Sequence, residues 1–94
     1  MGPVLRWHPE KARSNLRKHG VTFEEAASVF RDILSVTISD PLHSAGESRF
    51  LTIGRSDRDR TVVVVHSDVG ETIRIISARH ATRRERREYE EGAV

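Results

Sequence analysis

The first third of the chain carries apolar residues at the spacing of amphipathic helices. A helix is predicted from Pro9 to His19, because proline suits a first helical turn and Gly20 suits the position that follows the last one. Ala12, Leu16 and His19 fall on one stripe of this helix, at spacings of four and three. The stripe predicts the side of the helix that packs against the rest of the molecule.

A second helix is predicted to begin after Thr22. The Thr22 hydroxyl can accept from the backbone N–H of Glu25 while the Glu25 carboxylate reaches back, the arrangement called a capping box. The apolar residues that follow stand at i, i+3, i+4 and i+7, the spacing of a core-facing surface: Phe23, Ala26, Ala27 and Phe30. The helix is predicted to end between residues 30 and 32.

The apolar pattern then changes to one typical of strands. Strands are predicted over residues 33–39, 49–55, 61–66 and 72–78, with a short edge strand at residues 4–7. The unbroken run Val62 to Val65 is expected of a central strand covered on both faces. Because the loops between the four later strands are short, these strands should pair antiparallel as a meander.

A last helix is indicated by a second capping box, Thr82 to Glu85. Tyr89 is its only large apolar residue, so the helix should be exposed or docked through Tyr89 alone. The element order is therefore β-α-α-β-β-β-β-α. This order predicts an α+β fold, with an antiparallel sheet, the two N-terminal helices on one face, and a C-terminal helix.

Length and composition limit the possible classes. A chain of 94 residues and 10.7 kDa fits one domain spanning residues 1–94. The absence of cysteine excludes disulfide scaffolds and thiolate metal sites. No apolar run approaches the roughly 20 residues of a membrane span, so we expect a soluble cytoplasmic protein that does not contact the membrane.

The charge is nearly balanced but unevenly distributed. Residues 1–20 carry five cations and one anion, residues 21–48 one cation and five anions, and residues 49–94 ten cations and eight anions. Fourteen of the 16 cations are arginine, whose guanidinium binds two phosphate oxygens at once. Composition alone favours a solvated surface for these charges.

Motifs for several enzyme classes are missing from the sequence. It contains no zinc-protease helix, phosphate-binding glycine loop or dinucleotide fingerprint. The five histidines are scattered, without the close spacing of metal ligands on one element. We therefore expect neither a metal nor another cofactor.

The remaining candidates are charged residues near the ends of the predicted elements. Lys18 and His19 end the first helix, where the helix dipole favours a protonated imidazole; capping of the helix carbonyls is the alternative role of His19. Glu47 and Arg49 are two apart on a strand and share a face, either as a working pair or as a surface ion pair.

Arg74 and Arg79 are further candidates if the local structure places them on one face of the sheet. Arg74 and Arg79 are five apart, so a regular strand places them on opposite faces; they can serve one site only if Arg79 lies beyond the strand end or after a bulge. The aromatic residues Trp7 and Tyr89 can stack on bases, although for Trp7 a place in the core is favoured.

Several short motifs, taken in order, resemble the family of BrnT-type toxins. The N-terminal ones are Trp7-His8-Pro9-Glu10-Lys11-Ala12, Asn15, Lys18-His19-Gly20-Val21, Phe23-Glu24-Glu25-Ala26 and Val29-Phe30. The later ones are Asp32, Asp40, Glu47-x-Arg49, Ile53-Gly54, Val62 to Val65, Ile73 to Arg79, Ala81-Thr82, Glu85-Arg86 and Tyr89. Together they cover nearly the whole chain. One departure is His8, where the family usually has an Asp that would cap the first helix.

The resemblance implies a compact RelE/ParE-like fold and the toxin half of a type II toxin–antitoxin pair. Family members act as ribonucleases that stop translation. The implied partner is a BrnA-type antitoxin with a ribbon-helix-helix DNA-binding part, for which we expect a 2:2 hetero-oligomer. That complex represses its own operon, so operator DNA would be bound through the antitoxin.

Metal-free RNA cleavage by the 2′-OH needs a base, an acid and cations that face the charge growing on phosphorus. We expect arginines as the phosphate clamps: Arg49, Arg74 and Arg79. Lys18 and His19 would support charge or proton transfer, and Glu47 is the candidate base. Arg55, Arg83 and Tyr89 are expected to contact RNA around this site.

Two alternatives remain open from the sequence. ParE-type relatives share the fold and inhibit DNA gyrase without cutting RNA. A non-catalytic domain that binds RNA or a protein partner is the other alternative.

Overall fold

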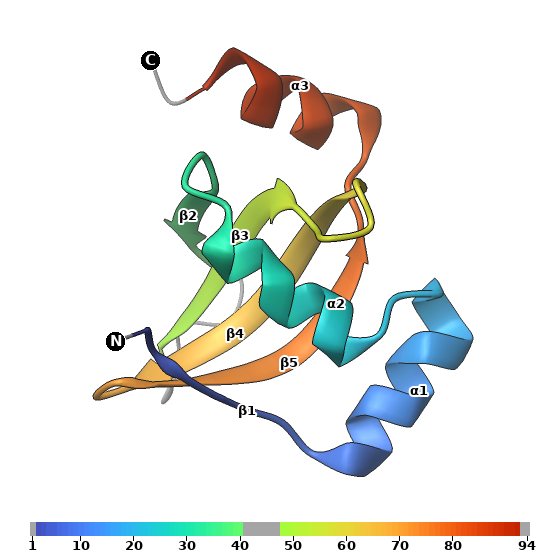
Figure 1. Cartoon of the computed structure of the whole chain (residues 1–94), viewed down its shortest axis with the longest axis vertical. Helices are drawn as coiled ribbons and strands as arrows, with labels where there is room; N and C mark the ends of the chain where they lie inside the picture. The colour runs from blue at the N-terminus through green and yellow to red at the C-terminus, as the bar shows by residue number, and fades with distance from the viewer. Residues whose placement is uncertain (1, 41–47, 93–94) are drawn as a thin grey trace.

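A computed structural model describes residues 2–40 and 48–92 of the chain (Figure 1). In chain order its elements are β1 (Val4–Arg6), α1 (Pro9–His19), α2 (Phe23–Ser28), the 3-10 turn η1 (Val29–Arg31), β2 (Val36–Ser39), β3 (Arg49–Arg55), β4 (Thr61–Val69), β5 (Thr72–His80) and α3 (Arg83–Glu91). The predicted order of elements is confirmed. No helix among the described residues has the length and apolarity that a bilayer crossing requires.

The five strands form one sheet in the order β1-β5-β4-β3-β2. Strands β2 to β5 pair antiparallel as the predicted meander. The expectation of a wholly antiparallel sheet is wrong, because β1 pairs parallel with β5. The short loops that follow β3 and β4 dictate the antiparallel direction of β3 to β5, whereas β1 is followed by two helices and no tight turn fixes its direction.

The core lies between α2 and one face of the sheet, which we call the first face. Phe23 and Ala26 of α2 pack there against Val62 and Val64 of β4 and Ala78 of β5, all fully buried. Trp7 packs against this cluster, with its ring edge-on to Phe23 at a centroid distance of 6.0 Å. The predicted core side of α2 and the core position of Trp7 are confirmed.

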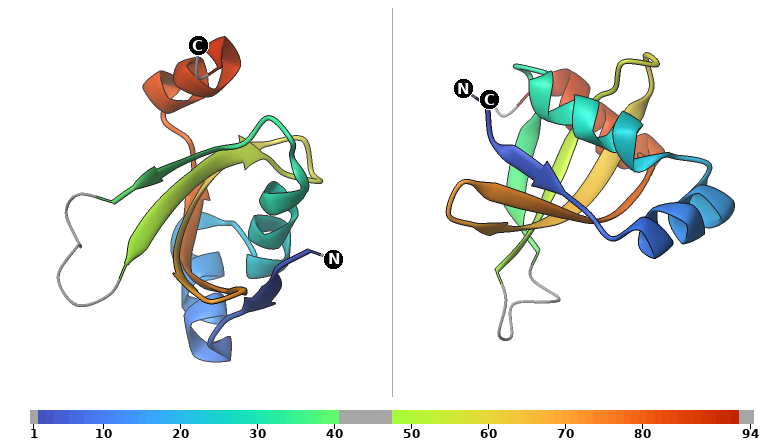
Figure 2. Two further views of the ribbon diagram at one scale, coloured as in Figure 1. Left: turned by 90° about the vertical axis from the view of Figure 1, so that its left-hand side faces the viewer. Right: turned by 60° about the horizontal axis from the view of Figure 1, so that its bottom comes forward.

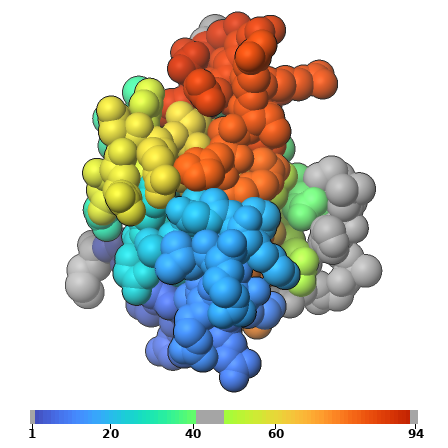
Figure 3. Space-filling view, turned by 90° about the vertical axis from the view of Figure 1, so that its right-hand side faces the viewer, coloured from blue at the N-terminus to red at the C-terminus, as the bar shows by residue number. Residues whose placement is uncertain are grey.

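Helix α1 lies against β5 at the edge that β1 leaves free, and Figure 3 shows α1 beside the end of β5 and the hairpin loop 56–60. Ala12 of α1 packs against the core cluster. Leu16, predicted on the same stripe, is 47% exposed. The prediction for Leu16 is wrong because the polar Asn15 is the α1 residue that faces β5.

The helix caps follow the sequence with two differences. Thr22 accepts from the Glu25 N–H as predicted, but the Glu25 carboxylate turns away, accepting from Ser56 Oγ and from the Arg60 guanidinium. At α1, His8 takes the capping position, and its Nδ1 accepts from the Glu10 N–H at 3.2 Å. An imidazole therefore caps the start of α1.

Helix α3 lies on the opposite side of the sheet from α2, the side that we call the second face (Figure 2). Both bonds of its predicted capping box are present, between Thr82 and Glu85. Tyr89 docks the helix by donating from its hydroxyl to Asp32 Oδ2 at 2.6 Å. As expected, α3 buries none of its residues, but Tyr89 is not its only attachment, since Glu85 also binds Arg79 through two hydrogen bonds.

Candidate functional site

The end of the second face that is distant from α3 carries a row of polar side chains. The strand register places Arg49 of β3 opposite Ser67 of β4, and Ser67 opposite Arg74 of β5. The same register places Arg6 of β1 beside Arg74. Neighbouring strands lie about 4.8 Å apart, so the Cα atoms of Arg49 and Arg74 are about 10 Å apart. We call Arg49, Ser67, Arg74 and Arg6 the arginine row.

Strand β5 contains a bulge between Arg74 and Arg79, one of the two arrangements that would let these arginines serve one site. Val65 pairs with Ser77 and His66 pairs with Ile75, which leaves Ile76 as the extra residue of β5. An extra residue shifts the alternation of side chains by one. Arg74 and Arg79 therefore project from the same face of the sheet although their separation is odd.

Arg79 stands at the other end of that face. It pairs with Val63, four residues along β4 from Ser67, so it lies about 13 Å from the arginine row at about 3.3 Å per residue. Its Nη1 and Nη2 donate to the two carboxylate oxygens of Glu85 at 2.7 and 2.9 Å. These bonds lower the pKa of Glu85 to about 2. In this conformation Arg79 binds α3.

A pocket of about 400 Å³ opens beside the arginine row. Its lining comprises Arg6, Ser67, Val69, Thr72 and Arg74. The side chains of Arg6 and Arg74 are exposed, whereas Ser67 is only 1% exposed. Two cations therefore flank a pocket with a hydroxyl in its lining.

The Ser67 hydroxyl is the one buried side-chain oxygen without a hydrogen-bond partner among the described residues. Most buried polar groups in proteins are paired, and leaving one unpaired costs about 1–3 kcal/mol. The unpaired Ser67 hydroxyl therefore lowers the stability of the fold without a ligand. A ligand oxygen that accepts a hydrogen bond from this hydroxyl would restore that stability.

Two other predicted site residues lie on α1, the helix that packs against β5. Lys18 and His19 line a second pocket of about 330 Å³, between α1 and residues Ile76 and Ser77 of β5. Arg49 also lines a small pocket with Ser39, Asp40, Ser48 and Phe50. Glu47 lies outside the described residues. Arg49 and Arg74 line different pockets, and Arg79 lines neither of these two.

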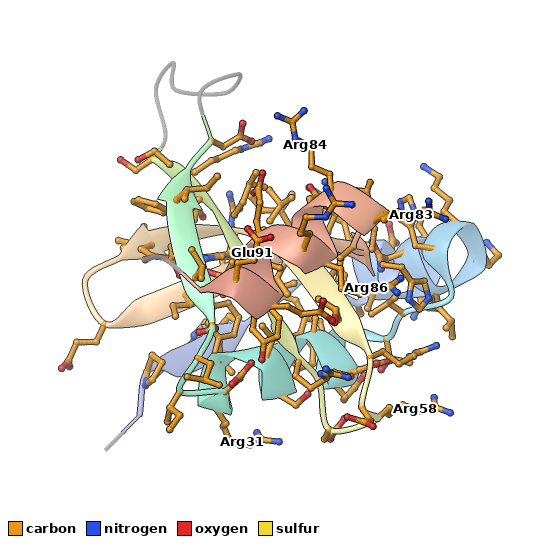
Figure 4. The ribbon with its side chains drawn as sticks, turned by 90° about the horizontal axis from the view of Figure 1, so that it is seen from above. Arg31, Arg58, Arg83, Arg84, Arg86 and Glu91 are labelled. Atoms are coloured by element: carbon orange, nitrogen blue, oxygen red, sulfur yellow. The ribbon has the colours of Figure 1, made fainter. Side chains whose placement is uncertain are left out.

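The three residues expected to contact RNA around the site lie near or on α3. Arg55 Nη1 pairs with Asp59 Oδ1 at 3.3 Å. Arg83 is exposed and extends outward from α3 (Figure 4). The Tyr89 hydroxyl is bound to Asp32. Burial raises the pKa of Tyr89, and the hydrogen bond to Asp32 raises it further.

A hydrogen-bonded chain centred on the buried His66 and Thr52 lies on the first face and was not predicted. His66 Nε2 contacts Thr52 Oγ1 at 2.7 Å, and His66 Nδ1 contacts Asp68 Oδ1 at 2.7 Å. Thr52 is in turn bonded to Thr37 at 2.7 Å. The spacing of His66 and Asp68 on one strand was the available signal, because residues two apart share a face. Phe30 and Phe50 flank the imidazole, which fits a structural role.

Sequence reasoning also missed Arg6 and Ser67. Neither belongs to a recognisable motif, and their position follows only from the pairing of β1 with β5 and β4 with β5. Among the residues that the structure describes, no group of three or more His, Asp or Glu side chains is placed to hold a metal ion. The described part of the candidate site consists of the arginine row, with its Ser67 hydroxyl, and of Lys18 and His19 on α1.

Comparison with known families gives this geometry a context. The sequence model of the family described as "Ribonuclease toxin, BrnT, of type II toxin-antitoxin system" matches residues 7–85. The chain belongs to the BrnT ribonuclease toxin family. Membership of a type II toxin–antitoxin family implies a protein antitoxin as partner.

A solved structure supports the fold. The chain is similar to the 1.1 Å crystal structure of the ribonuclease toxin BrnT from Brucella abortus, with a TM-score of 0.58 and 23% sequence identity. The match covers 86% of this chain and 99% of the other. The α+β fold with a five-stranded mixed sheet is therefore shared with a BrnT toxin. No significant match is found among curated protein sequences.

Proposed function

We propose that this BrnT-family chain is an endoribonuclease that cleaves RNA without a metal ion and thereby stops translation. We further propose that its fold is of the RelE-like type. Its antitoxin would be a BrnA-type ribbon-helix-helix protein in a 2:2 complex, and operator DNA would be bound through that antitoxin. Family membership supports the ribonuclease class, and the arginine row supports the position of the site.

The observation that carries the proposal is the placement of Arg49 and Arg74 in one cross-strand row. The row lies at the end of the second face that α3 leaves open. Two guanidinium groups about 10 Å apart at their Cα atoms can converge on one phosphate, because each arginine side chain is long and presents a planar fork of donors. Such groups stabilise the charge that develops on phosphorus in the transition state.

The proposed reaction is an attack of the ribose 2′-oxygen on the adjacent phosphorus. A bond forms between O2′ and phosphorus, the bond from phosphorus to O5′ breaks, and the products are a 2′,3′-cyclic phosphate and a 5′-hydroxyl end. Glu47, two residues from Arg49 in the sequence, is the proposed base for the 2′-OH proton. Lys18 and His19, in the pocket bordered by Ser77, are proposed to supply charge and a proton for O5′.

Arg79 can take part in this reaction only if its bonds to Glu85 are broken. Because Glu85 binds its guanidinium at two atoms, Arg79 can reach a phosphate only when that carboxylate is released. Arg79→Ala and Glu85→Gln separate the two roles. If Arg79 contacts RNA, Arg79→Ala lowers cleavage and Glu85→Gln preserves or raises it; equal effects of the two changes indicate that Arg79 only holds α3.

The test is incubation of the purified chain with RNA in EDTA, followed by analysis of the fragment ends. The proposal predicts cleavage with 2′,3′-cyclic phosphate ends and a loss of about 10²- to 10³-fold in rate for Arg74→Ala. Arg84→Ala is the matched control, since Arg84 is 90% exposed on α3 (Figure 4). Intact RNA would contradict the proposal; intact RNA together with blocked DNA supercoiling would favour a gyrase inhibitor.

A further inference from the structure

The arginine row extends beyond the two residues assigned to the scissile phosphate. Arg6 of β1 stands beside Arg74 in the parallel register of β1 and β5. Both residues line the same pocket of about 400 Å³, together with Ser67. This pocket lies on the β1 side of Arg74, whereas Arg49 lies on the opposite side, two strands away.

One feature of this pocket lacks an explanation from folding alone. The Ser67 hydroxyl is 1% exposed and has no hydrogen-bond partner in the described part of the chain. Leaving a buried hydroxyl unpaired costs about 1–3 kcal/mol. An anion in the pocket would give this hydroxyl an acceptor.

We propose that Arg6 and Ser67 form, with Arg74, a phosphate-binding subsite for the RNA phosphate next to the scissile one, and that Arg74 stands between the two phosphates and serves both. The proposal rests on the proposed function and assigns to the substrate a second anchored phosphate. Arg6 and Arg74 supply the charge, and Ser67 Oγ donates one hydrogen bond to a phosphate oxygen, as hydroxyl side chains do in nucleic-acid complexes.

Phosphate is favoured over a carboxylate as the bound group for a geometric reason. Two guanidinium forks and a hydroxyl supply donors from three adjacent strands, and a phosphate has enough oxygens to accept from all three. Arg6 is on β1, outside the β2 to β5 meander, so the subsite extends the bound strand from β3 to the edge strand β1. This places the substrate as an extended single strand.

The test measures binding of a 2′-O-methyl RNA oligonucleotide, which carries phosphates but cannot be cleaved. Affinity is measured over a range of salt concentrations for the wild-type chain and three variants. Arg6→Ala should weaken binding and reduce the slope of log K against log salt by about 0.7, the value for one phosphate contact on a single strand. Ser67→Ala should weaken binding with an unchanged slope, because a hydroxyl carries no charge.

Two controls make the result specific. Arg84→Ala removes an exposed arginine far from the pocket and should leave both affinity and slope unchanged. Ser67→Ala breaks no hydrogen bond among the described residues, so its thermal unfolding midpoint should equal or exceed that of the wild type. A Ser67→Ala chain that folds and binds normally would overturn the role of Ser67.

The outcomes separate this subsite from the proposed function. If Arg6→Ala keeps the wild-type slope and affinity while the wild type cleaves RNA in EDTA, the subsite is refuted and the ribonuclease proposal stands. If Arg6→Ala shows the predicted loss but no variant cleaves RNA, the subsite stands and the nuclease proposal fails. If Ser67→Ala weakens the binding of inorganic phosphate but leaves the binding of the RNA oligonucleotide unchanged, the assignment of the pocket to an RNA strand is overturned.

Discussion

Asn15 positions α1 through three hydrogen bonds from one buried side chain. Its Nδ2 donates to the carbonyl oxygens of Val21 and Ala78 at 2.9 and 2.8 Å, and its Oδ1 accepts from the Ala78 N–H at 3.0 Å. The amide thereby satisfies the backbone of β5 where no neighbouring strand does so. Because Lys18 and His19 follow on the same helix, Asn15 also fixes where those two residues stand relative to β5.

Replacing Asn15 by Ala should therefore cost stability. The change leaves the buried N–H and C=O of Ala78 without partners, and we expect a loss of about 2–3 kcal/mol in the free energy of unfolding. Denaturant titration measures this loss, with Arg13→Ala on the exposed side of α1 as the control. An unfolding free energy within 0.5 kcal/mol of wild type, roughly the range for neutral surface changes, would show that the amide is not what holds α1.

At the scale of elements, α3 is attached by a few polar contacts rather than by a buried face. None of its residues is buried, and its attachments are Tyr89 to Asp32 and Glu85 to Arg79. Beneath it, Val63 and Ile53 are buried on the second face. The helix thus divides the second face into a covered end and an open end that carries the arginine row.

The attachment through Glu85 predicts a dependence on pH. Hydrogen bonds from Arg79 lower the pKa of Glu85 from 4.5 to about 2. A carboxyl whose folded pKa is lowered adds stability above its unfolded pKa and loses it as pH falls through the folded value. The stability that Glu85 contributes is therefore complete above about pH 5 and disappears progressively between about pH 4.5 and 2.

Comparison with Glu85→Gln isolates this contribution. Gln at this position can still cap the Thr82 N–H, so the start of α3 is kept while the charge is lost. The difference in unfolding free energy between wild type and Glu85→Gln should be largest near neutral pH and should shrink at pH 3. Glu88→Gln, at an exposed position, should show no such change; a difference independent of pH would contradict the role given to the Glu85 charge.

At the scale of the whole molecule, the sequence predicted the elements better than their attachments. Helix α1 and strand β3 have the predicted bounds, because Pro9, Gly20 and the polar loop after Arg55 mark their ends. The parallel direction of β1 and the bulge at Ile76 were not predictable in the same way. Both depend on pairings between distant segments, which local patterns do not encode.

Only part of the candidate site was predictable from local sequence patterns. Arg49 and Arg74 were identified from their positions near strand ends, and they share a row. Arg6 and Ser67 carry no local motif and become visible only through the strand register. The engagement of Arg79 by Glu85 also depends on where α3 docks, and a single large apolar residue, Tyr89, gave little indication of that.

The most direct test of the account is the position of bound RNA on the protein. Backbone amide chemical shifts of the ¹⁵N-labelled chain are followed as a 2′-O-methyl RNA oligonucleotide is added. The account predicts the largest changes at the open end of the second face: Arg6, Arg49, Ser67 and Arg74. Changes confined to the outward side of α3 or to the hairpin loop 56–60, with the arginine row unaffected, would contradict it.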